Sequence, residues 1–393
     1  MLKLKSNIWK LHLISALRWF MVAMPIFVLF LQDNGLSMTQ IITLQVMFSI
    51  IIVVAEIPSG YLADIISRKI SIIIGLLLGF LAYVIYAQSY QFTGFLLAEM
   101  ILGFGSSFLS GADSALLYDT LGALNREGEY KKYQGFVLSA ENFSESIASI
   151  LGGFLAVISL RLPFYIQALV MLLGLIVALT LKEPERQKVD RSEGNVKTLV
   201  KTIRYAMHDH PAVKWLIIYS AIVSASTFSA VWFIQPYFAM VGLPLALFGI
   251  VWAAIQFTTG ATSLFAYKIE NFLGKKVSLI CLIFLPFFTY LLLGVFEALW
   301  AISFIFIFYI VRGFANPVFK DYVNNLIPSD TRATILSVQG LAMRLIFSIV
   351  GPFLGWIADL YSIQHAFFLT GILFLGLGII SLLFLKKHRV LSS

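Results

Sequence analysis

The sequence predicts an all-α membrane protein with twelve transmembrane helices in two pseudo-symmetric six-helix bundles. The composition, the recurrence of apolar runs and an internal repeat lead to this fold class. Of the 393 residues, 60% are hydrophobic and only 12% are charged, and the mean hydropathy is +0.90. Because a soluble domain is about half apolar and a quarter charged, this chain has too much apolar surface to bury in water.

Apolar runs long enough to cross a bilayer as helices recur along nearly the whole chain. We expect twelve spans, near residues 8–31, 41–61, 70–88, 92–118, 135–158, 162–182, 213–238, 245–267, 277–296, 298–318, 334–358 and 365–385. The first run starts with basic residues, as a signal peptide does, but it is too long for one and carries Arg18. We therefore expect it to be a retained helix.

Lys and Arg residues gather in alternate loops, which predicts the orientation of the chain. They lie at both termini and through 182–214, whereas the intervening loops hold almost none beyond Arg161. Because positively charged loops stay in the cytoplasm, we expect both termini on the inner side of a bacterial cell (inner) membrane. The net charge of +8 then faces anionic lipid, and the soluble basic domain that nucleic-acid binding needs is absent.

The longest polar interruption of the chain divides it into two halves. We expect an N-terminal six-helix bundle at 1–182, a cytoplasmic linker at 183–212 and a C-terminal six-helix bundle at 213–393. Within the linker, apolar residues from Val196 to Met207 repeat at helical spacing, with Lys and Arg between them. This pattern predicts a short helix on the membrane surface, with a solvated linker as the alternative.

The two halves resemble each other at two places, which indicates an internal duplication. Gly-Leu-Ser at 35–37 recurs as Gly-Leu-Pro at 242–244, and the glycine-containing segment Ser149–Ala156 recurs as Ser348–Gly355. Many carriers build their binding site at the interface of such repeats. We therefore expect a cavity between the two bundles, near the middle of the membrane.

Charged side chains inside the expected spans are candidates for function, because an ionised group there costs about 2.5–3.5 kcal/mol. These residues are Arg18, Glu56, Glu99, Asp113, Glu141, Glu145, Arg312 and Arg344. Glu141 and Glu145 lie one helical turn apart, so one of them is favoured in its protonated form unless a cation is near. We expect Arg18 to pair with one of them, and we take Glu99 and Asp113 as the next proton-coupling candidates. A permanent ion pair that never titrates is the alternative.

Aromatic residues make up 15% of the chain, and several lie in spans expected to line a cavity. Such a lining suits a lipophilic or planar substrate, although most membrane aromatics only pack or lie at the interface. Gln235 beside Pro236 adds an amide and a helix break. The substrate-cavity candidates are Trp19, Phe27, Phe228, Trp232, Gln235, Tyr237, Arg312 and Arg344.

The segment after the second run carries a family resemblance. Residues 60–69 read Gly-Tyr-Leu-Ala-Asp-Ile-Ile-Ser-Arg-Lys. This resembles the Gly-x-Leu-Ala-Asp-Arg-x-Gly-Arg-Lys signature of the major facilitator superfamily, which lies between helices 2 and 3. The resemblance implies a gating role for Gly60, Asp64 and Arg68. We expect Gly60 to let helices approach and Asp64 to accept hydrogen bonds from a helix N-terminus, whereas Arg68 also serves orientation in the alternative interpretation.

Two further segments resemble the bacterial drug-efflux-like branch of that superfamily. Ser110–Asp119 is one, and Gly351–Gly355 has the Gly-Pro-x-x-Gly pattern typical of its drug/proton antiporters. The resemblance implies proton-coupled export of amphiphilic or lipophilic small molecules by alternating access. We expect a monomer whose partners are a small-molecule substrate, protons and membrane lipids, with no nucleic acid, no cofactor and no metal.

Two other functions remain open from the sequence. One is a superfamily carrier for a defined solute, such as a sugar derivative, a metallophore or a lipid-linked headgroup, in which Arg312 and Arg344 bind an anionic group. The other is an intramembrane enzyme. The sequence contains no His-Glu-x-x-His, Gly-x-Ser-x-Gly or Walker A motif, so we expect no catalytic activity. Cys281 lies in an apolar span, where a packing role is expected.

Overall fold

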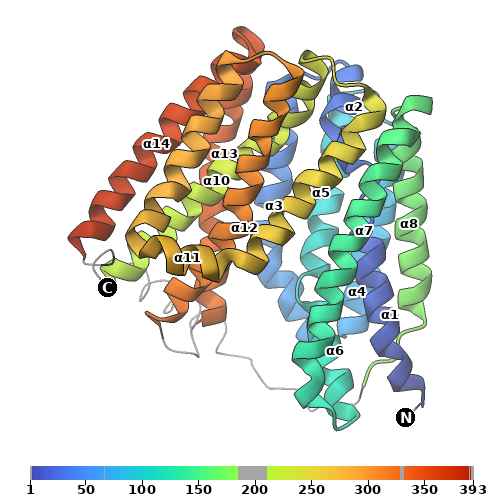
Figure 1. Ribbon diagram of the computed structural model, residues 1–393. Helices are drawn as coiled ribbons and strands as arrows, with labels where there is room; N and C mark the ends of the chain where they lie inside the picture. Colours follow the sequence, from blue (N-terminus) through green and yellow to red (C-terminus); the bar gives the residue numbers. More distant parts are fainter. Residues whose placement is uncertain (1, 66, 185–209, 328–331, 389, 391–393) are drawn as a thin grey trace. The chain divides into compact units, whose positions relative to one another are not determined.

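The computed structural model describes residues 2–65, 67–184, 210–327, 332–388 and 390. Within these ranges all regular secondary structure is helical, so the predicted all-α class is confirmed (Figure 1). The surface helix predicted within the linker lies in 185–209, outside the described residues.

Ten helical segments precede the linker. They are α1 (Leu2–Arg18), η1 (Met24–Ile26), α2 (Phe27–Asp33), α3 (Met38–Ile65), α4 (Arg68–Gln88), α5 (Phe92–Leu109), α6 (Ala112–Ala123), η2 (Glu127–Glu129), α7 (Tyr130–Ile158) and α8 (Leu162–Leu179). The segments after it are α10 (Pro211–Met240), α11 (Leu245–Val295), η4 (Leu299–Ala301), α12 (Ile302–Asn324), α13 (Arg332–Leu360) and α14 (Ile363–Lys387).

These segments account for the twelve predicted spans. Nine stretches among the described residues are long and apolar enough to cross a membrane. One of them, α11, leaves helical geometry at Gly274, where φ is 74°, and therefore provides two spans. The remaining spans are the interrupted first one, made of α1 and α2, and α7, which carries Glu141 and Glu145.

Two compact units divide the helices. The first contains α1 to α8, without Ser37–Ile42, together with Pro244–Ala254 at the start of α11. In this unit α4 packs against α5 and α8, and α1 packs against α6, α7 and α8. The second unit contains the other helices and Ser37–Ile42 at the start of α3. There α10 contacts α12, α13 and α14. It is buried on most of its surface, as expected for a helix that is apolar all round.

The first span is not the continuous helix that the sequence predicted, because it is broken between Arg18 and Met24. Pro25, at the start of η1, has no N–H to continue a helix. Within the break, the backbone N–H of Val22 donates to Oε1 of Gln167 on α8 at 2.7 Å and to the carbonyl oxygen of Phe20 at 3.1 Å. Gly152 of α7 lies against the same turn, since a Cβ atom built there would be 2.0 Å from the Val22 carbonyl oxygen.

The predicted repeat is confirmed by two glycines at equivalent positions. Gly35 follows α2 and Gly242 follows α10, with φ of +82° and +75°. A left-handed backbone is unfavourable for residues with a Cβ atom, so glycine suits both helix ends. In each case the next helix begins three residues later, at Met38 and at Leu245.

The other repeated segments contact these two helix starts. On α7, a Cβ atom at Gly153 would lie 2.8 Å from the nitrogen of Gly249 on α11. On α13, a Cβ atom at Gly355 would lie 2.9 Å from the carbonyl oxygen of Met38 on α3. The repeated glycine segment of α7 thus contacts the start of α11, and that of α13 contacts the start of α3. The same type of helix contact therefore occurs once in each unit.

Asp359 of α13 fixes the start of α3 within the second unit. Its carboxylate accepts hydrogen bonds from the backbone N–H of Met38 at 2.7 Å and of Thr39 at 2.8 Å, and from the Thr39 hydroxyl at 2.6 Å. A helix begins with N–H groups that have no partner inside the helix. Asp359 satisfies two of them and places a negative charge at the positive end of the helix dipole.

Candidate functional site

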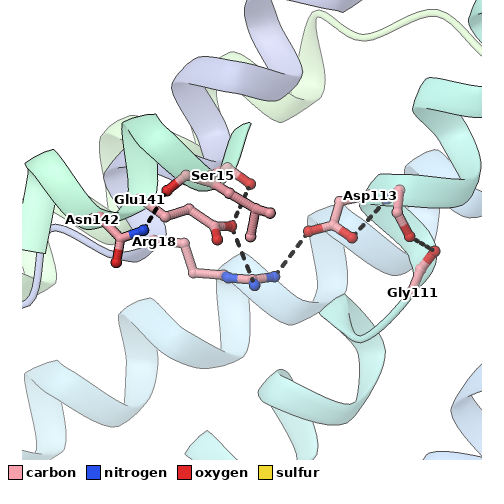
Figure 2. A network of polar contacts seen from close by, with 8 residues as sticks. Ser15, Arg18, Gly111, Asp113, Glu141 and Asn142 are labelled. Atoms are coloured by element: carbon pink, nitrogen blue, oxygen red, sulfur yellow. Dashed lines mark hydrogen bonds and ion pairs between the residues drawn. The ribbon is translucent and has the colours of Figure 1, made fainter. Parts of the chain in front are cut away.

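A cavity of about 190 Å³ lies in the first unit, with walls from α1, α6 and α7. Its charged lining residues are Arg18, Asp113 and Glu141. Figure 2 shows the Arg18 guanidinium between the two carboxylates. Arg18 Nη1 lies 3.0 Å from Asp113 Oδ2, and Nη2 lies 3.9 Å from Glu141 Oε1. Residues distant in sequence thus form one polar cluster, here called the Arg18 site.

Two members of the Arg18 site, Arg18 and Asp113, stand at helix ends. Arg18 is the last residue of α1, just before the break in the first span. Asp113 lies in the first turn of α6, behind Gly111, whose φ of 76° turns the chain between α5 and α6. Asp113 Oδ1 also accepts the Ser114 N–H at 2.7 Å. The two broken spans therefore meet at this site, and discontinuous helices are a common device for binding polar groups in membranes.

The Arg18 site contains one basic side chain and two acidic ones. Ser15 of α1 donates a hydrogen bond to Glu141 Oε1 at 3.1 Å, so this carboxylate has a hydroxyl and a more distant guanidinium as partners. The three side chains are only 14–26% exposed. With all groups ionised, one cation faces two carboxylates, and binding one proton would neutralise the cluster. Because charges are costly away from water, that proton exchange is the chemistry this arrangement supports.

The sequence predicted that Arg18 pairs with an acid of α7, and the structure places Glu141 beside it, with Asp113 closer. Asp113 is thus a mostly buried acid that pairs with Arg18 at the start of α6. Glu145 lies one turn along α7, is 8% exposed and is not part of the cavity wall. Glu99 of α5 is 2% exposed and accepts a hydrogen bond from the amide of Gln45 on α3. It lies outside the Arg18 site, and its role remains a prediction.

The loop signature forms a second polar cluster in the first unit. Arg68 Nη1 donates to the carbonyl oxygen of Ala115 at 2.7 Å and forms an ion pair with Asp119, both on α6. Glu183 accepts hydrogen bonds from the Ser67 hydroxyl at 2.8 Å and from the backbone N–H groups of Arg68 and Lys69 at 3.1 and 2.9 Å. The start of α4 is therefore tied both to α6 and to the chain that follows α8.

The expectation that Gly60 lets helices approach is wrong here, because a Cβ atom at Gly60 would meet nothing within 4 Å. The glycines that do sit at tight contacts are on other helices, such as Gly152. The side chain of Asp64 lies outside the described residues, so its gating role remains a prediction.

Residues 9–352 match the Major Facilitator Superfamily. The chain belongs to this superfamily. It is 23% identical over 198 residues to quinolone resistance protein NorA of Staphylococcus aureus (strain MRSA252), covering 50% of each chain. It is 27% identical over 188 residues to multidrug resistance protein 1 of Bacillus subtilis (strain 168), covering 48% of this chain and 47% of the relative. The chain thus spans about half the length of the curated relatives it matches.

Solved structures share the fold along nearly the whole chain. A mutant of the nucleoside transporter NupG has a TM-score of 0.81 at 15% identity, over 97% of this chain and 99% of that one. A bacterial homolog of the human lysosomal transporter Spinster has a TM-score of 0.75 at 16% identity, over 99% and 98%. At this low identity the likeness concerns the fold alone, and it confirms the predicted twelve-helix class.

Two of the residues predicted to line a substrate cavity, Trp19 and Phe27, lie in the first unit, and their surroundings differ from each other. The ring of Trp19 is 6.0 Å from the guanidinium carbon of Arg18, next to the Arg18 site. Phe27 is 7% exposed and packs against Tyr86 and Phe164. Phe27 therefore belongs to the packed interior of the unit.

The other candidates lie in the second unit. Phe228 packs against Trp232 and Phe347, and Gln235 is 1% exposed on the same helix. The hydroxyl of Tyr237 donates to the carbonyl oxygen of Phe296 at 2.6 Å. Arg312 lies over the ring of Tyr309 on α12, and Arg344 is partly exposed on α13. A substrate-binding role for these residues remains a prediction.

Several polar residues that support the two clusters were not predicted from the sequence. Ser15, Asp119, Gln167 and Glu183 each bond a group far away in the sequence. Gln167 could have been singled out, because it is a polar side chain in the middle of an apolar span, where it needs a partner. The partners themselves could not have been identified without the fold.

Proposed function

We propose that this protein is a secondary active transporter that exports amphiphilic or lipophilic small molecules in exchange for protons, by alternating access. The observation that carries the proposal is the Arg18 site, where one guanidinium lies between Asp113 and Glu141 beside a cavity. A cluster with one cation and two acids changes its net charge when it takes up one proton, which is what coupling to a proton gradient requires.

Glu141 is the proposed proton carrier. Its guanidinium partner is 3.9 Å away, whereas Asp113 is held at 3.0 Å and by the Ser114 N–H as well. The more weakly paired carboxylate gives up less interaction energy when it is protonated. Protonation of Glu141 then leaves Arg18 paired with Asp113 alone, and release of the proton draws Arg18 back toward α7. The two acids act as a coupled unit.

Export of lipophilic compounds is supported by the likeness to relatives that are named for quinolone and multidrug resistance. The fold alone does not select a substrate, because it is shared with transporters named for nucleosides. Trp19 beside Arg18 supplies an aromatic face next to the charged site, as an amphiphilic cation would need.

We further propose that the chain is a monomer in a bacterial inner membrane, with both termini and the 183–212 linker in the cytoplasm between bundles at 1–182 and 213–393. The support is the excess of Lys and Arg in alternate loops. On this orientation the Arg68–Asp119 pair and Glu183 lie at the cytoplasmic side, where they hold one closed state together with Asp64.

The test is transport in liposomes with an imposed pH gradient, using lipophilic cations, neutral drugs and anionic solutes as substrates. Glu141→Gln should abolish gradient-driven movement while downhill exchange survives, because substitution by the amide removes the exchangeable proton. Glu127→Gln, in the exposed first position of η2 before α7, is the matched control and should pump normally. Glu145→Gln tests the neighbouring acid. Normal pumping by both Glu141→Gln and Asp113→Asn would show that the coupling site lies elsewhere, and gradient-dependent movement of anionic solutes alone would favour a carrier for a defined solute.

A further inference from the structure

A second pocket of the first unit lies beside the start of α1, away from the Arg18 site. It has a volume of about 380 Å³. Its lining residues are Lys5, Ser6, Ile8, Trp9, Arg126 and Tyr133. They come from α1, from the turn after α6 and from α7, and Figure 1 shows these segments at the same end of the unit. We propose that this pocket binds the phosphate group of an anionic phospholipid.

The pocket has a basic wall. Its lining includes the basic side chains of Lys5 and Arg126, and the adjacent acid is Glu129, which pairs with Arg126. Lys5 is exposed and makes no hydrogen bond with the described residues, so its ammonium group is open to a ligand. The excess of positive charge favours an anion.

Arg126 is held in place for such a contact. Its Nε and Nη2 donate to the two oxygens of Glu129 at 2.6 and 2.8 Å, and Nη2 also donates to the Tyr133 hydroxyl at 2.7 Å. Its Nη1 has no hydrogen-bond partner in the described part of the chain. Because the guanidinium is already ordered, little conformational entropy is lost when the free edge meets a phosphate oxygen.

The lining also contains the aromatic side chain of Trp9, which identifies the ligand as a lipid. Trp9 is 56% exposed and lies one turn after Lys5 on α1, at the point where the first apolar run begins. An exposed indole at the end of a membrane span is typical of the boundary between headgroups and acyl chains. A free phosphate would use the basic wall only, whereas a phospholipid also covers the indole with its glycerol and upper chain.

The first experiment measures lipid binding to the full chain in a neutral detergent. The rise in apparent melting temperature is titrated with phosphatidylglycerol, with phosphatidylcholine of the same acyl chains and with sn-glycerol 3-phosphate. Phosphatidylglycerol should bind more tightly than phosphatidylcholine, and glycerol phosphate should give no rise at the same concentration. Lys5→Gln should weaken phosphatidylglycerol binding about fivefold, which corresponds to about 1 kcal/mol at 25 °C.

Two variants serve as controls. Lys5→Arg keeps the charge and should bind phosphatidylglycerol as the wild type does. Lys387→Gln removes an exposed lysine from the last turn of α14, far from this pocket in sequence, and should also leave binding unchanged. Unchanged binding by Lys5→Gln would overturn the proposal, and an equal response to glycerol phosphate would show a site for free phosphate instead.

The second experiment locates the lipid by fluorescence. Phosphatidylglycerol with brominated acyl chains should quench tryptophan emission more strongly than the brominated phosphatidylcholine. This difference should disappear in Trp9→Phe, because Trp9 is the tryptophan in the pocket wall. If the difference persists in Trp9→Phe, the anionic lipid binds elsewhere and the proposal fails. Neither experiment depends on transport activity, so the outcome is separate from the proposed export function.

Discussion

Gly249 on α11 tests whether the repeated helix contact limits side-chain size. A Cβ atom built at Gly249 would lie 2.0 Å from the carbonyl oxygen of Ser149 and 3.0 Å from the nitrogen of Gly153, both on α7. Carbon atoms pack at about 3.5–4.0 Å from their neighbours, so Gly249→Ala forces the two backbones apart by more than about 1 Å. Overpacking of this kind costs about 1–3 kcal/mol.

The same helix offers a matched control. A Cβ atom at Gly260 would meet nothing within 4 Å. Replacing a helical glycine by alanine stabilises a helix by about 0.5–1 kcal/mol, and this gain cancels when the two variants are compared. Gly249→Ala should therefore be about 1–3 kcal/mol less stable than Gly260→Ala.

The measurement is the apparent melting temperature of the purified variants in one detergent, followed by tryptophan emission. Gly249→Ala should melt below the wild type, and Gly260→Ala at or above it. A disulfide formed between a pair of cysteines flanking the α7–α11 contact should also form more slowly in Gly249→Ala. If Gly249→Ala melts together with Gly260→Ala, the close contact is not maintained in the membrane protein, and the steric argument is refuted.

Two further variants test local features of the first unit. Gln167→Leu removes the shorter of the two hydrogen bonds of the Val22 N–H and should cost about 0.5–1.5 kcal/mol, seen as a lower melting temperature than that of Gln91→Leu, an exposed control. The hydrogen bond from Arg126 lowers the pKa of Glu129, so this residue contributes stability at neutral pH that is lost as the pH falls through its lowered pKa. Glu129→Gln should therefore melt below the wild type at neutral pH, and the two curves should converge in acid. A constant difference between them at every pH would contradict the ion-pair interpretation.

The course of the twelve spans could be predicted because apolar length is a local property of the sequence. The breaks within two of them could not. Pro25 was visible, but the turn at Val22 also needs Gln167, which follows it by 145 residues. Likewise, Gly111 precedes Asp113 in the sequence, yet only its left-handed backbone shows that a new helix starts there and directs the acid toward Arg18.

For the paired acids of α7 as well, the sequence does not show which side chain faces the site. Helical spacing placed Glu141 and Glu145 on one face, and they do lie one turn apart. Positions four residues apart differ by about 40° around a helix, because each residue turns it by about 100°. That difference, together with the end of α1, puts Glu141 in the cavity wall and leaves Glu145 buried elsewhere. Which acid faces a cation depends on the neighbouring helices and not on the spacing.

The cap that Asp359 provides for α3 has a consequence for synthesis of the chain. The hydrogen bond from Thr39 to Asp359 joins residues 320 positions apart. At about 5–20 residues per second, a ribosome adds Asp359 roughly 16 to 64 s after Thr39. During that interval the first turn of α3 has emerged without its acceptor, so water or lipid headgroups must solvate its N–H groups. The start of α3 therefore belongs to the last part of the protein to fold, although it is among the first to be made.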